Sequence, residues 1–279
     1  MRRTQHRGRH LPEARRDSQP ETGWPFNALV SWLPDPIAPQ GTDCAGGGEL
    51  DCPHSAAESF SNNSILASLS SEEFSEIRSH LQQLQFKRGH LFYNVGAPIE
   101  FVCFPLAGMI CLFAVMHDGR TVALAAVGPK GFLGVPVLLG AQAASLRAVA
   151  LIEGTALTLH RNQLLRILSA APQFAAALRS YCGAHLAQVV QIGACHALHT
   201  VPQRLAMWLL TAHDQSNSDS LALTHESLSE MLGCRRSSIS EALSLLQEAH
   251  AVRAGRGHIH IVDRVRLTEQ SCECYASLH

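Results

Sequence analysis

The spacing of apolar residues divides the chain into four segments. Residues 1–63 follow no steady period and are rich in Pro, Gly, Ser and charge. This composition predicts a disordered N-terminal extension, or extra sequence from an upstream start codon. Residues 64–171 begin with a helical pattern from Ser71 and continue as short apolar runs broken by turn signals. Residues 172–199 and 200–279 return to apolar positions three and four residues apart, which is the spacing of helices.

A small antiparallel β-roll is the expected fold of residues 64–171. Their apolar runs are separated by the turn sequences GAP, AG, HDG and GPKG. Asp118-Gly119 lies between two of these runs and is a strong hairpin signal, because Asp-Gly favours the tight turns that join antiparallel strands. Several short strands joined in this way are typical of a barrel or roll. The helix before them has Ser71 as its expected N-cap.

Residues 172–199 predict one long helix that starts at Pro172, since proline is tolerated in the first helical turn. At 1.5 Å per residue this helix is about 40 Å long, more than the core of a small domain requires. Alanine and glycine are frequent along it and let another helix approach closely, although Gly183 and Gly193 weaken it in isolation. We therefore expect a dimerisation helix that pairs with a second copy of the chain in a homodimer.

Residues 200–279 predict a helix-turn-helix followed by a wing. Thr224 can cap the first short helix, and Gly233 can end it in the left-handed conformation that glycine tolerates. The apolar positions of the two helices fall at helical spacing and comprise Leu228, Met231, Leu232, Ile239, Ala242, Leu243 and Leu246. The sequence VRAGRGHIHIVD predicts two short strands around a glycine-containing turn, with Arg253 and Arg256 as further phosphate contacts.

The polar side of the second helix has the chemistry of a DNA-reading surface. Ser237 and Ser240 are small enough to let the backbone approach base edges, and Arg235 and Arg236 can bond guanine bidentately or hold phosphate. The alternative is an ordinary helical hairpin with a solvated surface. Seven arginines stand against nine acidic residues over 200–279, so DNA binding would depend on where these charges lie and on two copies of the domain.

The whole chain carries a formal net charge of −1 at pH 7, so its total charge exerts no bulk attraction on nucleic acid or membrane. No apolar run reaches the ~18 residues that a membrane-spanning helix needs. The nine cysteines form no CxxC motif and no secretory signal precedes them, which predicts a soluble protein in a reducing cytoplasm. No P-loop, GxGxxG, GxSxG or HExxH motif is present, and the chain is therefore not expected to be an enzyme.

The order of these parts resembles the Crp/Fnr family of bacterial transcription regulators over roughly residues 64–275. The stretches that carry the resemblance are FPLAGMI, HDGRTV, VGPKGFLGVPVLLG, RLAMWLL and LTHESLSEMLGCRRSSISEALSLLQEAHAVRAGRGHIHIVD. It implies an α+β fold with an antiparallel, cyclic-nucleotide-binding-like β-roll, a long dimerisation helix and a C-terminal winged helix-turn-helix. It also implies a homodimer on a roughly two-fold-symmetric site in double-stranded DNA, with a signal passing from the roll through the helix, and RNA polymerase as a further partner.

Carried over residue by residue, Arg236 matches an arginine with which members of this family read bases. Arg235, Ser237, Ser238 and Ser240 occupy neighbouring recognition positions. The predicted DNA-contacting set is therefore Thr224, Arg235, Arg236, Ser237, Ser238, Ser240 and Arg256. Ser237 stands where those members of the family have a glutamate, and Glu241 stands where they have an arginine. The operator sequence of this chain is therefore expected to differ from theirs.

Cyclic nucleotide is not expected as a cofactor. Nucleotide-binding members of the family place a Gly-Glu-Leu turn against the ribose and an Arg-Ser/Thr-Ala segment against the cyclic phosphate. The equivalent turn here is Gly134-Val135-Pro136, and valine cannot accept the ribose hydrogen bonds that a carboxylate accepts. Arg147 is followed by alanine with no Ser or Thr between them.

A metal is likewise not predicted. Cys44 and Cys52 are eight residues apart, as are Cys103 and Cys111, and neither pair has the spacing of the iron–sulfur branch of the family. Cys103 and Cys111 lie in apolar runs and are expected to be small core residues. The groups Cys182/His185 and Cys195/His196/His199 have helical spacings that could bind metal, but sixteen histidines make chance pairs frequent. Cys272-Glu273-Cys274 is too closely spaced for an ordinary zinc clasp.

One other function stays open on the residues alone. The chain could be a sensor that holds a ligand, metal or redox group in the roll, with a C-terminal domain that mediates protein contacts instead of binding DNA.

Overall fold

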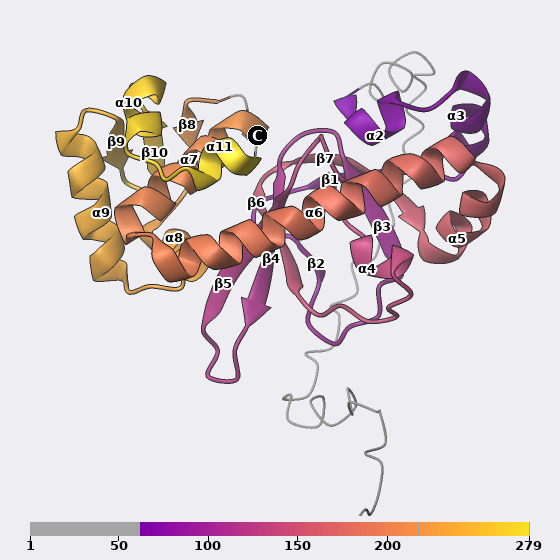
Figure 1. Cartoon of the computed structure of the whole chain (residues 1–279), viewed down its shortest axis with the longest axis horizontal. Coiled ribbons are helices and arrows are strands. Elements are labelled where there is room, and N and C mark those ends of the chain that lie inside the picture. The colour runs from indigo at the N-terminus through magenta and orange to yellow at the C-terminus, as the bar shows by residue number, and fades with distance from the viewer. Residues whose placement is uncertain (1–61, 217, 279) are drawn as a thin grey trace, which may run out of the picture. The chain divides into compact units, whose positions relative to one another are not determined.

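A computed structural model describes residues 62–216 and 218–278. The prediction of disorder over 1–63 therefore falls almost entirely on residues outside the described ones. The described residues confirm the α+β fold, with an antiparallel β-roll, one long helix and a C-terminal winged helix-turn-helix (Figure 1). Within the same part of the chain, no helix is both long and apolar enough to cross a membrane.

The roll consists of two antiparallel sheets, with strand orders β1-β7-β3 and β2-β6-β4-β5. The strands are β1 (Gln82–Phe86), β2 (Leu91–Tyr93), β3 (Phe101–Pro105), β4 (Met109–Val115), β5 (Thr121–Val127), β6 (Arg147–Ile152) and β7 (Gly154–His160). Alternate side chains of a strand point to opposite faces of its sheet. On β4, Ile110 and Leu112 pack inside the roll, whereas Met109, Cys111 and Phe113 belong to a second core shared with the C-terminal domain. One strand therefore serves two cores.

The hairpin predicted at Asp118-Gly119 joins β4 to β5. Gly119 has a φ of 83°, a left-handed conformation that glycine adopts without strain. The Asp118 carboxylate accepts hydrogen bonds from the Arg120 amide at 3.1 Å and from Arg120 Nε at 2.7 Å. These bonds, with the nearby positive charge, lower the pKa of Asp118. The turn is therefore determined by adjacent residues.

Four shorter helices surround the roll: α2 (Ser64–Ala67), α3 (Ser71–Arg78), α4 (Val135–Leu138) and α5 (Arg161–Ala170). Helix α3 starts at the predicted residue, but the expected N-cap at Ser71 is wrong by one position. Ser70 is the cap, and its Oγ accepts a hydrogen bond from the Glu73 amide at 3.2 Å. Two adjacent serines satisfy the same sequence pattern, so the pattern alone does not distinguish them.

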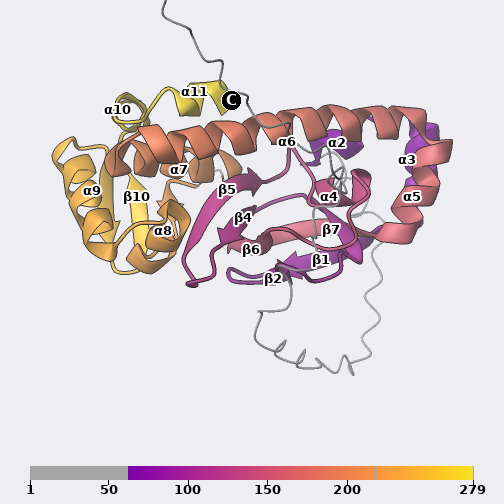
Figure 2. The same cartoon turned by 60° about the horizontal axis from the view of Figure 1, so that its bottom comes forward.

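Helix α6 (Pro172–Leu198) has the bounds predicted from the sequence and runs beside the roll (Figure 2). Its own N-cap residue, Ala171, provides no side-chain hydrogen bond. The Glu73 carboxylate of α3 caps the helix instead, accepting hydrogen bonds from the amides of Gln173 and Phe174, each at 2.9 Å. An anion at this position satisfies exposed amides and complements the positive end of the helix dipole.

Replacing Glu73 with alanine should lower the free energy of unfolding by about 1 kcal/mol, since it removes a charged cap from the longest helix. Urea denaturation followed by circular dichroism measures this loss. Glu72→Ala is the matched control, because the neighbouring carboxylate is also in the first turn of α3 and is exposed. Equal urea midpoints for the two variants would show that Glu73 does not act as the cap.

The C-terminal domain is built from α7 (Val201–Ser216), β8 (Ser220–Leu221), α8 (His225–Leu232), α9 (Arg236–Glu248), β9 (Val252–Gly255), β10 (His258–Ile261), α10 (Arg264–Glu269) and α11 (Cys274–Leu278). Its sheet has the order β8-β10-β9. The core forms around α7, whose Trp208 is 1% exposed, and extends to the second half of α6 and to the outer face of β4. The apolar faces of α8 and α9 pack against this core.

Candidate nucleic-acid interface

Helix α8 is held at both ends by the residues that the sequence predicts. Thr224 Oγ1 accepts a hydrogen bond from the Ser227 amide at 3.1 Å, and Ser227 Oγ accepts one from the Thr224 amide at 3.0 Å. Gly233 ends the helix with φ 60° and ψ 34°, a left-handed C-cap. These local interactions set the tight turn that leads into α9.

Helix α9 buries its apolar face and presents its polar face to solvent. The predicted core positions Ile239, Ala242, Leu243 and Leu246 are all buried. On the other face Arg235, Arg236, Ser237 and Ser240 are exposed, and Ser238 is half-buried. The predicted orientation of this helix is therefore confirmed, while contact between these side chains and DNA stays a prediction.

Arg236 forms an ion pair that the sequence analysis missed. Its Nη2 lies against Glu226 Oε1 of α8, across the turn from α9. The side chains are 62% and 65% exposed, and ion pairs between solvent-exposed groups contribute only about 0–1 kcal/mol. The pair orients the arginine at the start of α9 but is weak enough to be exchanged for a stronger anion.

The wing is a hairpin of β9 and β10 joined by Arg256-Gly257. Gly257 has a φ of 81°, which the turn requires and glycine supplies. Gln247 of α9 accepts a hydrogen bond through Oε1 from the Ala254 amide at 2.8 Å, so the wing is attached to the end of the second helix. Arg253 and Arg256 are exposed on it, as expected. Nothing in the helical pattern of α9 indicates the Gln247 contact.

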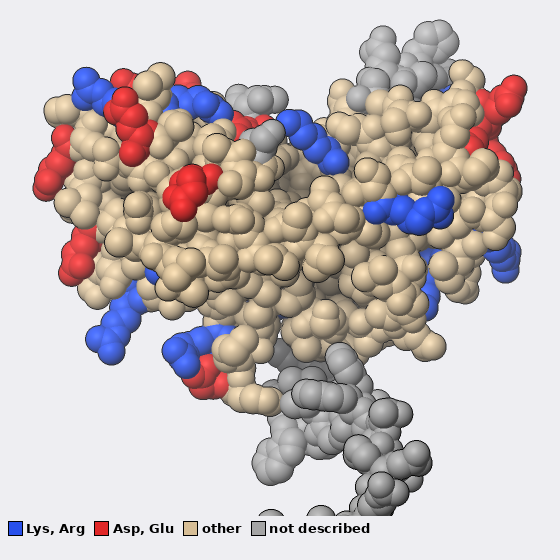
Figure 3. Space-filling view, in the orientation of Figure 1, with Lys and Arg blue, Asp and Glu red and all other residues tan. Residues whose placement is uncertain are grey.

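Charges of both signs are interspersed over this domain. Figure 3 shows blue and red side chains side by side around α8, α9 and α10, with no large field of one sign on this face. This agrees with the seven arginines and nine acidic residues of 200–279. Any attraction to phosphate must come from the few arginines at the start of α9 and on the wing.

The roll contains a cavity of about 140 Å³ and a larger one of about 510 Å³. The smaller cavity is lined by Tyr93, Leu112, Phe132, Leu133, Gly134, Val135, Pro136, Ala144, Ser145, Leu146 and His185. Among the described residues the lining includes no Arg, Lys, Asp or Glu. Its buried His185 has a pKa lowered by desolvation, which favours the neutral ring.

Arg147 does not line this cavity. Its guanidinium carbon lies 5.5 Å from the centroid of the Phe113 ring, and the side chain lines a groove that it shares with Arg120 and Arg235. The residue considered as a phosphate ligand from the sequence is therefore placed at the junction between the roll and the helix-turn-helix.

Two family models match the chain within these two structural regions. A Crp-like helix-turn-helix domain matches residues 203–270, and a cyclic nucleotide-binding domain matches residues 83–171. The chain belongs to the Crp/Fnr family. This Crp/Fnr protein is a DNA-binding transcription regulator and not an enzyme.

This Crp/Fnr protein is similar to relatives and solved structures at 14–24% sequence identity. The cyclic AMP receptor protein of Thermus thermophilus is 24% identical over 201 residues, which cover 72% of this chain and 93% of that protein. The structure of FixK2 from Bradyrhizobium japonicum has a TM-score of 0.59 at 21% identity, covering 69% of this chain and 98% of that one. The c-di-GMP-responsive regulator CLP of Xanthomonas campestris has a TM-score of 0.59 at 14% identity, covering 70% and 100%. The two structural comparisons support the fold.

A series of hydrogen bonds connects the roll of this Crp/Fnr protein to its helix-turn-helix. His196 Nε2 of α6 lies 2.9 Å from the Ala123 carbonyl of β5, and Arg204 Nη1 of α7 lies 2.9 Å from His196 Nδ1. Arg204 also donates to the Leu232 carbonyl, at the end of α8, at 3.1 Å. A carbonyl only accepts and a guanidinium only donates, so His196 is neutral with its proton on Nε2. Desolvation lowers the pKa of His196 and favours this form.

Two direct hydrogen bonds also join the roll to the C-terminal domain. Thr121 Oγ1 of β5 donates to the Glu230 carbonyl of α8 at 3.2 Å. Arg88, between β1 and β2, donates to the Ala222 carbonyl just before α8. The Crp/Fnr roll therefore contacts both ends of the first helix of the DNA-binding motif, through residues that no local pattern connects.

Helix α6 has two apolar faces. Phe174, Leu178 and Ile192 are buried within the chain. Leu186 and Val190 are 65% and 64% exposed, and they belong to a stripe spaced three and four residues apart that comprises Gly183, Leu186, Val190, Gly193 and Ala197. A Cβ added to Gly183 or Gly193 would meet nothing within 4 Å. This spacing is that of a coiled-coil seam, which fits the dimers typical of the Crp/Fnr family.

The structure also separates the cysteines by environment. Cys103 and Cys111 are buried in the roll of this Crp/Fnr protein as predicted, and burial raises the pKa of both thiols. Cys44 and Cys52 lie outside the described residues. Cys195 of α6 and its C-cap residue His199, however, meet Cys272 and Cys274 from the last described residues of the chain. The spacings Cys-x3-His and Cys-x-Cys are visible in the sequence, but the sequence does not show that they converge.

Proposed function

We propose that the chain acts as a homodimer that reads an inverted repeat in double-stranded DNA with α9, and that it does so without cyclic nucleotide. The observation that carries this proposal is the orientation of α9. Its small polar face is exposed beside two arginines, while its apolar face is anchored in the core. A helix held in this way can enter the major groove without rearranging its own domain. Because its target is DNA, we also propose that the protein is located in the cytoplasm.

In this proposal Arg235 and Arg236 supply the strongest contacts. Each guanidinium can bond the O6 and N7 atoms of guanine, or two phosphate oxygens. Ser237, Ser238 and Ser240 let the helix approach the bases closely. Their hydroxyl groups can both donate and accept hydrogen bonds, so they discriminate between bases less than the arginines do.

Thr224 and Arg256 bind the DNA backbone on either side of α9 in this proposal. The Thr224 hydroxyl is already engaged in the capping box, so its contribution is to present the first amides of α8 to a phosphate. Arg256 lies in the two-residue turn of the wing, where it is exposed. Contacts of this type set the register of the protein without reading sequence.

One observation supports independence from cyclic nucleotide. The two cavities of the roll, of about 140 Å³ and about 510 Å³, have no Arg or Lys in their described lining. A cyclic phosphate is an anion, and the described lining offers no cation to bind it. The relative from Thermus thermophilus is named for cyclic AMP and that from Xanthomonas campestris for c-di-GMP. We propose that neither nucleotide is the effector here.

Dimerisation through α6 supports the rest of the proposal. Net charge over 200–279 is −2, from seven arginines and nine acidic residues, so a single domain has little electrostatic attraction to DNA. Two domains related by a two-fold axis double the base contacts on one site. As a transcription regulator, such a dimer could also contact RNA polymerase.

Selection of bound fragments from random double-stranded DNA tests this function. The full chain should enrich an inverted repeat whose two half-sites lie one or more helical turns apart. Parallel selections with cyclic AMP, with cyclic GMP, with c-di-GMP and with no addition should enrich the same repeat to the same extent. Recovery of unrelated sequences in all selections would contradict the DNA-reading assignment. Enrichment only with a nucleotide would contradict the effector assignment.

A further inference from the structure

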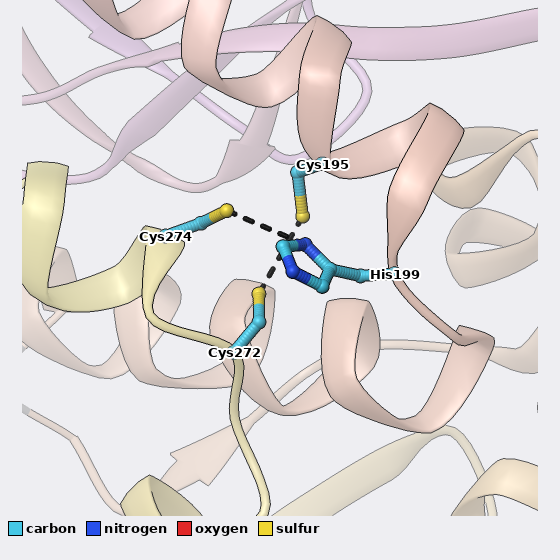
Figure 4. A group of neighbouring side chains, drawn as sticks. All are labelled: Cys195, His199, Cys272 and Cys274. Atoms are coloured by element: carbon cyan, nitrogen blue, oxygen red, sulfur yellow. Dashed lines mark hydrogen bonds between the residues drawn. The ribbon is translucent and has the colours of Figure 1, made fainter.

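Four potential metal ligands converge where α6 meets the last residues of the chain (Figure 4). Cys195 and His199 lie one turn apart at the end of α6, and Cys272 and Cys274 lie just before and at the start of α11. One ligand atom from each of the four residues lies within 4.8 Å of the other three. Cys195, Cys272 and Cys274 are buried, and the His199 side chain is 17% exposed.

Two of the distances between ligand atoms fit a single tetrahedral ion. Cys195 Sγ and Cys272 Sγ are 3.5 Å apart, and Cys274 Sγ lies 3.5 Å from His199 Nδ1. Zinc bonds of about 2.3 Å to sulfur and about 2.0–2.1 Å to nitrogen, at tetrahedral angles, place the ligand atoms about 3.5–3.8 Å from one another. A disulfide requires about 2.05 Å between the sulfurs, so the cysteines are not paired in that way.

The donor set selects the ion. Three thiolates and one imidazole in a tetrahedral arrangement are typical of structural zinc sites. Soft sulfur ligands disfavour magnesium and calcium, which prefer oxygen. All four positions are supplied by the protein, so no coordination position remains for water or substrate and the site is not catalytic.

The surrounding polar groups orient the ligands. Glu273 Oε1 lies 3.2 Å from His199 Nε2, so its carboxylate accepts a hydrogen bond from Nε2–H and leaves the Nδ1 lone pair directed at the cysteines. A carboxylate on the far nitrogen of a metal-bound histidine is a frequent supporting contact. Gln191 Nε2 also donates to Cys274 Sγ at 3.1 Å. Glu273, the residue between the two cysteines, therefore orients the His199 ring.

We propose that Cys195, His199, Cys272 and Cys274 bind one zinc ion that fastens the C-terminal segment to the end of the long helix. Binding takes three protons from the thiols and releases them to solvent. The ion lies where α6 gives way to α7, so it holds the base of the DNA-binding domain. Taken by itself, Cys272-Glu273-Cys274 is too closely spaced for an ordinary zinc clasp. The structure adds two more ligands, Cys195 and His199, from the end of α6.

Metal analysis of the untagged full-length protein tests the site. Protein from zinc-supplemented cells should contain about one zinc per chain, and Cys272→Ser or Cys274→Ser should remove that equivalent. Anaerobic cobalt titration should produce tetrahedral visible bands and a thiolate charge-transfer band in the wild type but not in Cys272→Ser or Cys274→Ser. Cys182→Ser is the matched control, because this thiol is also on α6 but outside the cluster. It should keep the metal.

Three results would overturn the proposal: a wild type that binds neither zinc nor cobalt, loss of the metal in Cys182→Ser, or iron bound by the four residues in place of zinc. If the serine variants fail to fold, Glu273→Ala keeps all four ligands and still tests the site. Its zinc affinity, measured by competition with a chromophoric chelator, should fall about 10–100-fold. An affinity equal to that of the wild type would overturn His199 as the fourth ligand.

Discussion

Replacement of both Arg235 and Arg236 with alanine should lower affinity for the selected operator by at least about 100-fold. Each well-placed bidentate contact to a base contributes about 1–3 kcal/mol of discrimination. The dimer loses four such contacts, two in each domain, which costs about 4 kcal/mol or more and exceeds the ~2.8 kcal/mol of a 100-fold loss, at about 1.4 kcal/mol for each factor of ten. Fluorescence anisotropy at one fixed salt concentration, with operator and with random DNA, measures the loss.

Three variants control this result. Arg266→Ala removes an exposed arginine of α10 that lies at the C-terminal end of α9, opposite the end that carries Arg235 and Arg236, and it should bind the operator as the wild type does. Arg236→Lys keeps the charge but loses the planar fork, so it should lose preference for the operator while retaining non-specific binding. Glu226→Ala frees Arg236 from its ion pair and should not weaken binding. Unchanged operator affinity in the double alanine variant would refute the assignment of α9 as the recognition helix.

Replacement of Leu186 and Val190 with glutamate should convert the dimer to a monomer. Both side chains lie in the exposed apolar stripe of α6. In a two-fold interface these changes place four carboxylates on one apolar seam, where unpaired charges are costly to desolvate. We expect at least a 100-fold rise in the dimer dissociation constant, which corresponds to about 3 kcal/mol or more. Light scattering coupled to gel filtration measures the mass.

Leu139→Glu is the control for this variant, since Leu139 is 75% exposed but lies outside α6. It should remain dimeric with wild-type operator affinity. The α6 variant should keep the circular dichroism spectrum of the wild type, because both replaced side chains are largely exposed within one chain. A dimeric mass for the double glutamate variant would show that the α6 stripe is not the interface.

Much of the architecture follows from local patterns in the sequence. The Asp118-Gly119 hairpin, the bounds of α6 and the buried positions of α9 all agree with the structure. Each depends on residues within a few positions of one another, where turn chemistry and helical period act directly. The prediction of a Crp/Fnr regulator with an α+β fold is confirmed by the two matching family models and by the structure.

The features that local patterns did not reveal all join distant parts of the chain. Glu73 caps α6 from 100 residues away, and no spacing rule predicts such a contact. Helix α6 is apolar on two sides, so its period could not separate Ile192, which packs inside, from Leu186, which faces outward. The four metal ligands combine two short spacings from opposite ends of the C-terminal domain. The roles of the predicted DNA-contacting residues remain predictions.

The first and last residues of the DNA-binding domain both lie at the C-terminal end of α6. Cys195 and Cys272 are 77 positions apart along the chain, yet their sulfurs are 3.5 Å apart. Domains whose two ends lie together tolerate transfer into a new host, because the graft leaves the host geometry undisturbed. Residues 200–271 can therefore be exchanged between related regulators at a single junction, but the graft must also match the outer face of β4, with which this domain shares a core. Such an exchange should transplant operator preference while the sensor and the dimer seam stay with the recipient.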